Sequence, residues 1–584
     1  MVEYAILPRD FFTGFIGRFD MVACMWIRAW LLVAVMASPL VGAAQDVVIT
    51  VDASKTVGAY RPVWSYFGAD EPNFVYAANG KTLLHELAGL SAASVYVRLH
   101  NLLTTGDGSG SLKWGSTNAY REDAQGRPVY DWTITDKIFD AMRDAGVRPL
   151  VEVGFMPEAL STHPEPYRHT FPEGDVFTGW SYPPKDYEKW SALVSAWVKH
   201  LHERYGEAAG KTWLWEVWNE PDIPYWHGSS EEYDRLYDVT AAAIQKELPE
   251  AKIGGPEATG VAAGKSEAFL RQFLEHCSRG KNFATGGTGA PLAFISFHPK
   301  GSPKTVDGHV RMDIGHQLRA TELGMKVVAS YPEWKNTPII LGESDPEGCA
   351  ACKGPQNGYR NGPLYGVSVA EAIARQNELA AKYGVTLQGA VTWALEFEDQ
   401  PLFAGFRELA TGGKVNGKSF LVDKAVLNVF RMMGMMGGDY VAVTNSKALP
   451  LEQVLGGSVR ADADVGVVAT RSEHKLEVLL WNYHDDDVAA AATPIDLKVD
   501  GLPAAARRVL VEHFRIDATR SNAFEVWKAM GSPPQPSGEQ FRQLEAAGQL
   551  QLLSSPEWVT AVNGEVALKF DLPRHAVSLL RVTW

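Results

Sequence analysis

The chain has 584 residues, which is too long for one compact core and predicts two to four domains. Its formal net charge of −14 at pH 7 repels phosphate backbones, so we expect no nucleic-acid partner. Four cysteines are few for a secreted chain, so we expect that disulfides do not hold the fold together.

Residues 1–44 are typical of a leader that contains a secretory signal peptide. Arg28 precedes the apolar run "AWLLVAVMASPLVGAA", which ends in small residues and is shorter than the ~20 apolar residues of a membrane span. We expect cleavage after Ala43 or Ala44, with translation starting at Met1 or Met21; an uncleaved anchor is the alternative. The mature chain is therefore expected to be secreted or periplasmic, without stable membrane insertion, and its oligomeric state stays open.

Residues 64–415 alternate short apolar runs with helical patterns. Amphipathic stretches such as residues 190–201 place apolar side chains at helical spacing between the runs. Eight such runs separated by helices predict a (β/α)8 TIM barrel, and a doubly wound sheet is the alternative. The predicted strands are "WSYFG", "SVYVRL", "PLVEVG", "TWLWEVW", "AKIGG", "AFISF", "PIILG" and "GAVTWA".

After residue 415 the sequence pattern changes to alternating or apolar runs, such as "KLEVLLWNY" and "RRVLVEHFRI". No long helical patterns separate these runs. This pattern predicts an accessory antiparallel β-sandwich at residues 416–584. The segment "SNAFEVWKAMGSPPQPSGEQFRQLEAAGQ" is a helical insertion, with a short helix on each side of a Pro-rich turn. Residues 45–63 contain the isolated strand "DVVITVDA", which is expected to pair with the β-sandwich.

Carboxylates and amides follow the predicted barrel strands, whose C-terminal ends carry the chemistry of such barrels. "WLWEVWNEPD" places Asn219 and Glu220 after the fourth strand, and "IILGES" places Glu343 after the seventh. Two carboxylates facing each other across a barrel mouth suit the hydrolysis of a glycosidic bond, because the leaving oxygen needs a proton and the developing oxocarbenium ion needs a carboxylate beneath it. Asn219 can hydrogen-bond the 2-hydroxyl group of the sugar. The simpler alternatives are a solvated carboxylate at Glu220 and a salt-bridged loop residue at Glu343.

No cofactor or metal is expected. The sequence has no His/Cys set with zinc spacing, no phosphate-binding glycine loop and no nucleophile elbow. The expected partner is a small oligosaccharide.

The chain resembles glycoside hydrolase family 39, whose barrel enzymes carry the acid/base and the nucleophile on strands four and seven. The matching motifs span almost all of the mature chain and include "YFGADEPNFVY", "VEVGFMPEAL", "WEVWNEPD", "FISFHPKG" and "FRIDATRSNAFEVWKAMGSPP". The resemblance implies a retaining, exo-acting β-xylosidase. An α-L-arabinosidase or arabinobiosidase and a uronic-acid glycosidase are alternatives on the same fold, and a non-catalytic carbohydrate-binding barrel is the alternative of another class.

The resemblance also implies roles for individual residues. Glu220 becomes the acid/base, Glu343 the nucleophile and Asn219 the partner of the 2-hydroxyl group, while Arg98 orients Glu343. A cis peptide bond is expected after Trp393. The implied substrate-binding residues are His100, His298, Trp393 and Glu398, to which Asn73 and Phe155 are added from their positions after strands one and three. The alternatives are core positions for the two histidines and a surface charge for Glu398.

The loop "GESDPEGCAACKG" after Glu343 departs from the β-xylosidases of the family, which leaves the sugar and the linkage open. Cys349 and Cys352 in this loop either form a disulfide or stay reduced, and a metal site would need more ligands than the sequence offers nearby. Cys277 is expected to be a buried or helix-borne free thiol.

Overall fold

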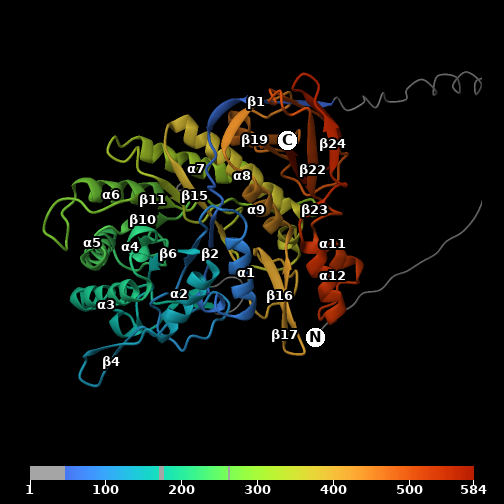
Figure 1. The fold of residues 1–584 in the computed structure, drawn as a ribbon. Coiled ribbons are helices and arrows are strands. Elements are labelled where there is room, and N and C mark those ends of the chain that lie inside the picture. Colours follow the sequence, from blue (N-terminus) through green and yellow to red (C-terminus); the bar gives the residue numbers. More distant parts are fainter. Residues whose placement is uncertain (1–45, 170–175, 261–263) are drawn as a thin grey trace, which may run out of the picture. The chain divides into compact units, whose positions relative to one another are not determined.

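A closed barrel of eight parallel strands organises the N-terminal part of the described chain (Figure 1). The computed structural model describes residues 46–169, 176–260 and 264–584, so the predicted leader lies outside the described residues. Each predicted apolar run forms one barrel strand, which confirms the TIM barrel and excludes the doubly wound sheet. The strands are β2 (Tyr66–Ala69), β3 (Tyr96–Leu99), β6 (Arg148–Val153), β9 (Leu214–Val217), β10 (Lys252–Ala258), β11 (Phe294–Phe297), β14 (Ile339–Leu341) and β15 (Leu387–Trp393).

The barrel strands are short and almost entirely buried, as parallel strands covered by helices must be. Every residue of β9 is buried, and its Val217 pairs in register with Val153 of β6. Val391 of β15 pairs with Tyr66 of β2 and closes the ring. Because all eight strands are parallel, their C-terminal ends meet at one face of the barrel.

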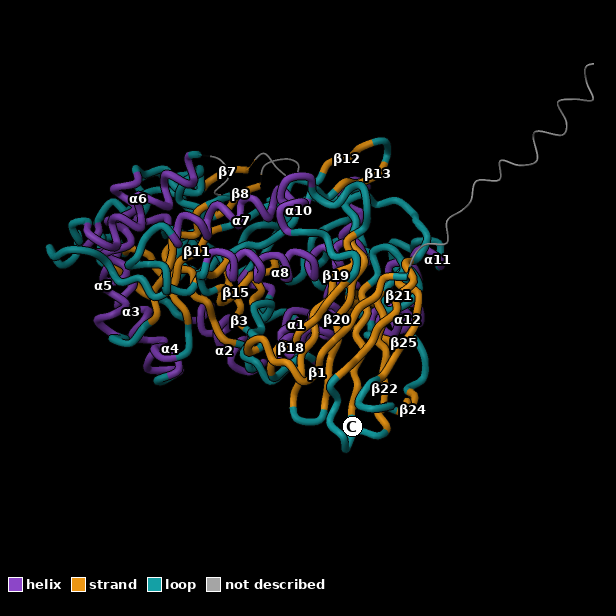
Figure 2. Tube along the Cα trace, turned by 90° about the horizontal axis from the view of Figure 1, so that it is seen from above, coloured by secondary structure: helices purple, strands orange, loops and turns teal. Residues whose placement is uncertain are grey.

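Helices lie around the outside of the barrel strands (Figures 1 and 2). The predicted amphipathic stretch lies in α3, where Trp190 and Trp197 are fully buried. The start of α5 is fixed by a capping box, in which Ser229 and Glu232 each accept a hydrogen bond from the other's backbone N–H. The helices are α1 (Ala78–Ala88), α2 (Thr133–Ala145), α3 (Tyr187–Tyr205), α4 (Ala208–Lys211), α5 (Ser230–Glu247), α6 (Lys265–Arg279), α7 (Ile314–Ala329) and α8 (Pro363–Tyr383).

The second large element is a curled, mainly antiparallel sheet of ten strands that fits the predicted β-sandwich (Figure 2). The early strand β1 belongs to this sheet, because it pairs antiparallel with β18 and parallel with β21. The curled sheet buries its own apolar cluster, which includes Ile49, Val478 and Leu497. Its strands are β1 (Val47–Ala59), β18 (Asp439–Asn445), β19 (Asp464–Ser472), β20 (Lys475–Tyr483), β21 (Thr493–Asp500), β22 (Arg508–Ile516), β23 (Gln551–Leu552), β24 (Glu557–Thr560), β25 (Val566–Leu572) and β26 (Val577–Thr583).

Smaller elements decorate the two large ones. The predicted insertion forms α11 (Ala523–Ala529) and α12 (Gly538–Gly548), one on each side of the Pro-rich turn. The domain boundary predicted between residues 415 and 416 falls at the turn of a hairpin. This hairpin is formed by β16 (Ala410–Val415) and β17 (Lys418–Asp423). The remaining elements are η1 (Pro72–Phe74), β4 (Tyr120–Glu122), β5 (Pro128–Tyr130), η2 (Glu158–Leu160), β7 (Tyr167–His169), β8 (Val176–Thr178), β12 (Lys304–Val306), β13 (His309–Arg311), η3 (Pro355–Asn361), α9 (Ala425–Met435) and α10 (Leu451–Gly457).

A buried polar cluster joins the barrel to the curled sheet. Arg375 of α8 donates to Glu371 one turn earlier, at 2.8 Å, and to Asp464 at the start of β19. Trp481 of β20 donates from Nε1 to Glu371 Oε2 at 2.6 Å. Because these groups are buried, each depends on its partner across the contact.

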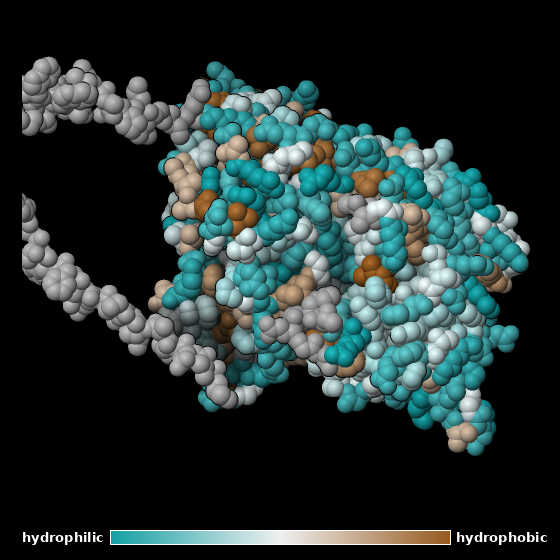
Figure 3. Space-filling model, turned by 180° about the vertical axis from the view of Figure 1, so that it is seen from behind, coloured by the Kyte–Doolittle hydropathy of each residue, from teal (hydrophilic) through white to brown (hydrophobic). Residues whose placement is uncertain are grey.

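The surface is mostly hydrophilic with scattered apolar side chains, as Figure 3 shows for one face. Among the described residues, no helix has the length and apolar character needed to cross a membrane.

Candidate active site

Glu220 and Glu343 follow β9 and β14 at the C-terminal face of the barrel. Beyond β9, Trp218 and Glu220 adopt left-handed backbone conformations, with φ of 74° and 45°. Such angles are uncommon for residues other than glycine and turn the chain sharply out of the strand. The backbone N–H of Glu220 donates to the carbonyl of Glu257 at 3.1 Å, which fixes this turn against the end of β10.

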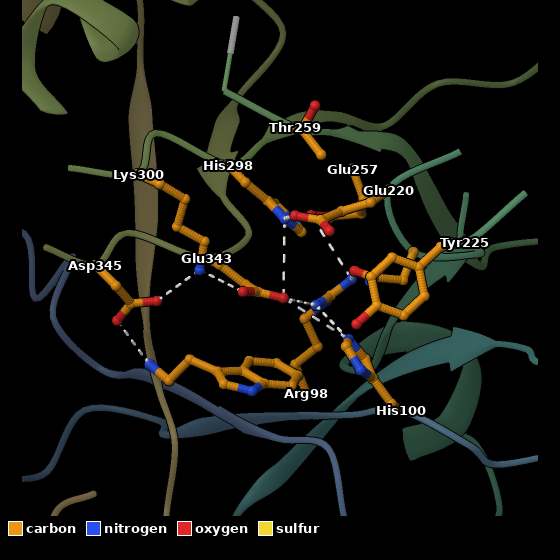
Figure 4. A network of polar contacts seen from close by, with 12 residues as sticks. Arg98, His100, Glu220, Tyr225, Glu257, Thr259, His298, Lys300, Glu343 and Asp345 are labelled. Carbon is orange, nitrogen blue, oxygen red and sulfur yellow. Dashed lines mark hydrogen bonds and ion pairs between the residues drawn. The ribbon is translucent and has the colours of Figure 1, made fainter. Parts of the chain in front are cut away.

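The two carboxylates approach each other closely. One oxygen of Glu220, one oxygen of Glu343 and a ring nitrogen of His298 lie within 4.8 Å of one another. Figure 4 shows these side chains converging at the centre of one polar network. The side chains of Glu220 and Glu343 are 13% and 8% exposed, so both are partly open to solvent. A short spacing of this kind is typical of retaining glycosidases, whose carboxyl groups lie about 5–5.5 Å apart.

Positive groups surround Glu343. Lys300 Nζ donates to its Oε2 atom, and Arg98 Nη1 lies 3.4 Å from Oε1. His298 Nδ1 lies 3.8 Å from the same oxygen. Burial alone would raise the pKa of Glu343, but the charges of Lys300, His298 and Arg98 outweigh burial and hold the pKa well below the usual range. Glu343 is therefore a carboxylate at neutral pH.

His298 lies between Glu220 and Glu257 and contacts both. Its Nδ1 lies 2.8 Å from Glu220 Oε1, and its Nε2 lies 2.6 Å from Glu257 Oε2. Burial lowers the pKa of this imidazole, but the carboxylates of Glu343, Glu220 and Glu257 overcome burial and raise the pKa to about 9. A charged imidazole donates from both nitrogens, so His298 holds Glu220 by one oxygen.

Arg98 of β3 is fully buried beneath the two carboxylates. In addition to Glu343, it contacts Glu152 at 3.0 Å and donates to Glu216. It also donates from Nη2 to Asn219 Oδ1 at 3.0 Å, which orients the amide beside Glu220. Arg98 therefore contacts Glu343, as predicted, and in addition fixes the orientation of Asn219.

Asp70 joins two further predicted residues, His100 and Trp393. Its Oδ1 lies 3.0 Å from His100 Nδ1, and its Oδ2 accepts from Trp393 Nε1 at 3.1 Å. The two rings lie 4.5 Å apart, and His100 Nε2 is 3.8 Å from Glu343 Oε1. The peptide bond from Trp393 to Ala394 is cis, as predicted.

Of three other predicted residues, Phe155 packs edge-on to His100, with ring centroids 6.0 Å apart, whereas Asn73 and Glu398 contact residues outside the network of Glu220 and Glu343. The amide of Asn73 donates to Ser116 O at 2.8 Å and accepts from Ser116 N at 2.8 Å, so it holds a loop. Phe155 stacks on Tyr225 at 5.8 Å, and Glu398 lies 4.0 Å from Lys414. Within the described part of the chain, the contacts of Asn73, Phe155 and Glu398 do not reach Glu220 or Glu343.

Glu257, Lys300 and Asp345 belong to the network but were not predicted from the sequence. Glu257 lies in β10, which was predicted to end at Gly255. Lys300 lies two residues after His298 in "FHPKG", and Asp345 lies two after Glu343 in "GESD". Each could have been found from its place at the end of a barrel strand.

The trio of Glu220, His298 and Glu343 has donor atoms of the types that bind metals. Its surroundings oppose a cation, however, because Lys300 and Arg98 already lie against Glu343 and His298 is protonated. The charges around the trio therefore suit an anionic nucleophile better than a metal ion.

The loop after Glu343 is tied to the same network. Cys349 and Cys352, whose pairing the sequence leaves open, form a disulfide. Cys277, in α6, is a buried free thiol, as predicted. Arg407 lies 3.0 Å from Asp345 Oδ2, which in turn accepts from Lys300 Nζ at 2.9 Å. The loop thus helps to place Lys300 beside the nucleophile candidate.

Comparisons with known proteins agree with this geometry. The profile described as "Glycosyl hydrolases family 39" matches residues 47–557. A β-xylosidase of Geobacillus stearothermophilus is 24% identical over 83% of this chain and 86% of its own length. An α-L-iduronidase of Mus musculus is 25% identical over 88% of this chain and 77% of its own length. A solved bacterial orthologue of human α-L-iduronidase shares the fold, with a TM-score of 0.75 and 20% identity over 93% of this chain and 84% of that one. The chain belongs to glycosyl hydrolases family 39 and is a glycosidase.

Proposed function

We propose that the chain is a retaining, exo-acting β-xylosidase that releases xylose from xylo-oligosaccharides. The observation that carries the retaining mechanism is the approach of Glu220 and Glu343 to within 4.8 Å, measured between carboxylate oxygens. The similarity to a β-xylosidase over most of both chains supports the choice of sugar.

The first step forms a bond between Glu343 and the anomeric carbon. Glu343 attacks as a carboxylate while Glu220 gives its proton to the leaving oxygen, and the glycosidic bond breaks. In the second step Glu220 takes a proton from water, the water attacks the anomeric carbon, and Glu343 leaves as a carboxylate. Because His298 holds one oxygen of Glu220, the other oxygen is available for the proton transfer. Asn219, oriented by Arg98, faces the 2-hydroxyl group of the sugar in this arrangement.

A panel of nitrophenyl glycosides tests the choice of sugar. The β-xyloside should be hydrolysed with the highest kcat/KM, ahead of the α-L-arabinoside and the α-L-iduronide.

Glu343→Ala should abolish hydrolysis, and added azide should partly restore it because a small anion can take the place of the missing carboxylate. Near-wild-type hydrolysis by Glu343→Ala would exclude Glu343 as the nucleophile.

A uronic-acid glycosidase is the second candidate, and Lys300 favours it. The Lys300 side chain is 14% exposed and lies against Glu343, so its ammonium group stands next to the sugar site and can pair with a carboxylate on the sugar. The similarity to an α-L-iduronidase points the same way. If this candidate is correct, the α-L-iduronide becomes the best substrate of the panel, and Lys300→Met lowers kcat/KM more for the iduronide than for the xyloside.

Export from the cytoplasm is also proposed. The disulfide between Cys349 and Cys352 supports it, since such bonds persist in oxidising compartments. N-terminal sequencing of the protein recovered from cell fractions tests the proposal: a start near residue 44 or 45 in the exported fraction is expected, and an intact N-terminus in the cytoplasm would contradict it.

A further inference from the structure

A cleft of about 660 Å³ lies between two loops of the barrel. Its lining residues include Ser111, Leu112 and Trp114 on one side and Glu165 and Phe177 on the other. The volume falls in the range of small-molecule sites, which combine apolar and aromatic walls with a few polar groups. Phe177 is 39% exposed, so part of its ring is accessible from the cleft.

Both walls of this cleft, here called the Trp114 cleft, belong to the face that carries Glu220 and Glu343. Ser111, Leu112 and Trp114 follow β3. On the other wall, Glu165 precedes β7 and Phe177 lies in β8, and both strands follow β6. Lys113, between Leu112 and Trp114, turns inward and places Nζ 3.4 Å from Asp70 Oδ2. Asp70 also contacts His100 through Oδ1 and Trp393 through Oδ2. One wall is thereby anchored to the floor of the candidate active site.

The other wall reaches the side of the active site where Glu220 lies. Tyr167 of β7 packs its ring 5.2 Å from that of Tyr225, and Tyr225 Oη lies 3.0 Å from His169 Nε2. Figure 4 shows Tyr225 next to Glu220 and on the opposite side of the network from Lys300 and Asp345. Burial and the negative charge of Glu220 both raise the pKa of Tyr167, in keeping with this placement.

We propose that the Trp114 cleft binds the leaving-group part of the glycoside, a neutral sugar unit that stacks on Trp114 and Phe177. The inference rests on the proposed role of Glu220 as the acid. That acid protonates the leaving oxygen, so the leaving group lies on its side of the reaction centre. Aromatic side chains offer flat apolar faces to the ring C–H groups of a sugar, and the Ser111 hydroxyl can bond its hydroxyl groups. The exposed carboxylate of Glu165 disfavours an anionic leaving group.

The test compares two substrates with the same glycone. Xylobiose has a sugar as its leaving group, whereas β-D-xylosyl fluoride has a single atom and cannot use the cleft. Trp114→Ala and Phe177→Ala should each lower kcat/KM for xylobiose about tenfold and change kcat/KM for the fluoride by less than twofold. Trp558→Ala and Phe283→Ala are matched controls, because these aromatic residues are 59% and 37% exposed and lie outside the cleft; they should leave both substrates unchanged.

The outcomes separate this inference from the proposed function. If the wild-type chain hydrolyses neither probe, the β-xylosidase assignment fails. If it hydrolyses both, and the cleft variants lose nothing on xylobiose or lose the same factor on both probes, the cleft inference alone fails. Since Phe177 is exposed, its variant keeps the test valid even if Trp114→Ala does not fold.

Discussion

Lys300→Met removes the positive group that contributes most to the low pKa of Glu343. Lys300 Nζ donates to Glu343 Oε2 and, at 2.9 Å, to Asp345 Oδ2. One opposite charge at such a distance lowers the pKa of a carboxyl group by about 1–3 units, which corresponds to about 1.4–4 kcal/mol. Arg98 and His298 remain beside Glu343, so its carboxylate persists at neutral pH in the variant.

The ionised form of Glu343 is the nucleophile, and this determines the direction in which activity changes with pH. Activity is lost as the pH falls through the pKa of Glu343, which is far below neutrality in the wild type. In Lys300→Met this loss should occur about 1–3 pH units higher. The assay is the pH dependence of kcat/KM on a nitrophenyl glycoside between pH 2 and pH 9.

Two control variants isolate the local charge. Lys300→Arg keeps the positive charge, so its acidic limb should stay near that of the wild type. Lys304→Met removes one lysine charge from an exposed site in β12, and it should leave the profile unchanged. If active Lys300→Met has a profile that superimposes on the wild-type profile, the assigned role of Lys300 in the electrostatics of Glu343 is wrong.

Three further predictions concern other parts of the molecule. Glu220→Ala should lower kcat/KM by about 10²–10⁴ for glycosides with poor leaving groups but only slightly for glycosyl fluorides; equal losses would contradict its role as an acid. Arg375→Met should cost about 3–5 kcal/mol in the free energy of unfolding, measured by urea denaturation, because it strands the buried carboxylate of Asp464; a cost under 1 kcal/mol would refute this. The double variant of Cys349 and Cys352 to serine should cost at most about 2 kcal/mol by the same measurement, since the bond closes a short loop with a sequence separation of 3; complete unfolding would show that the disulfide holds the fold together.

The barrel could be predicted because its signals are local. Each barrel strand is a short apolar run whose residues are buried on both faces, and the amphipathic residues of α3 recur at helical spacing. The second sheet was predicted from alternating runs, but its strand order was not. The insertion of β1 between β18 and β21 joins residues 380 to 448 positions apart, and nothing local in β1 specifies either neighbour.

The prediction of the active site was likewise limited to features that are local in the sequence. Glu220 and Glu343 stand out because each directly follows an apolar strand, and the structure brings both into one network. Glu257 and Lys300 also stand at the ends of barrel strands, but their contacts with His298 and Glu343 depend on which strands are neighbours and on how the side chains turn, which a linear pattern does not encode. Asn73 also follows a barrel strand, yet its amide is used by the backbone of a loop 43 residues further on.

Covalent trapping tests the central claim most directly. A 2-deoxy-2-fluoro glycoside with an activated leaving group slows both steps, so the sugar bound to the nucleophile accumulates and can be located by mass spectrometry of proteolytic fragments. We predict one fluoro-sugar on the peptide that contains Glu343, and no label in Glu343→Ala. A label on a different residue, or hydrolysis with inverted stereochemistry and no label, would contradict the assignment of Glu343 as the nucleophile.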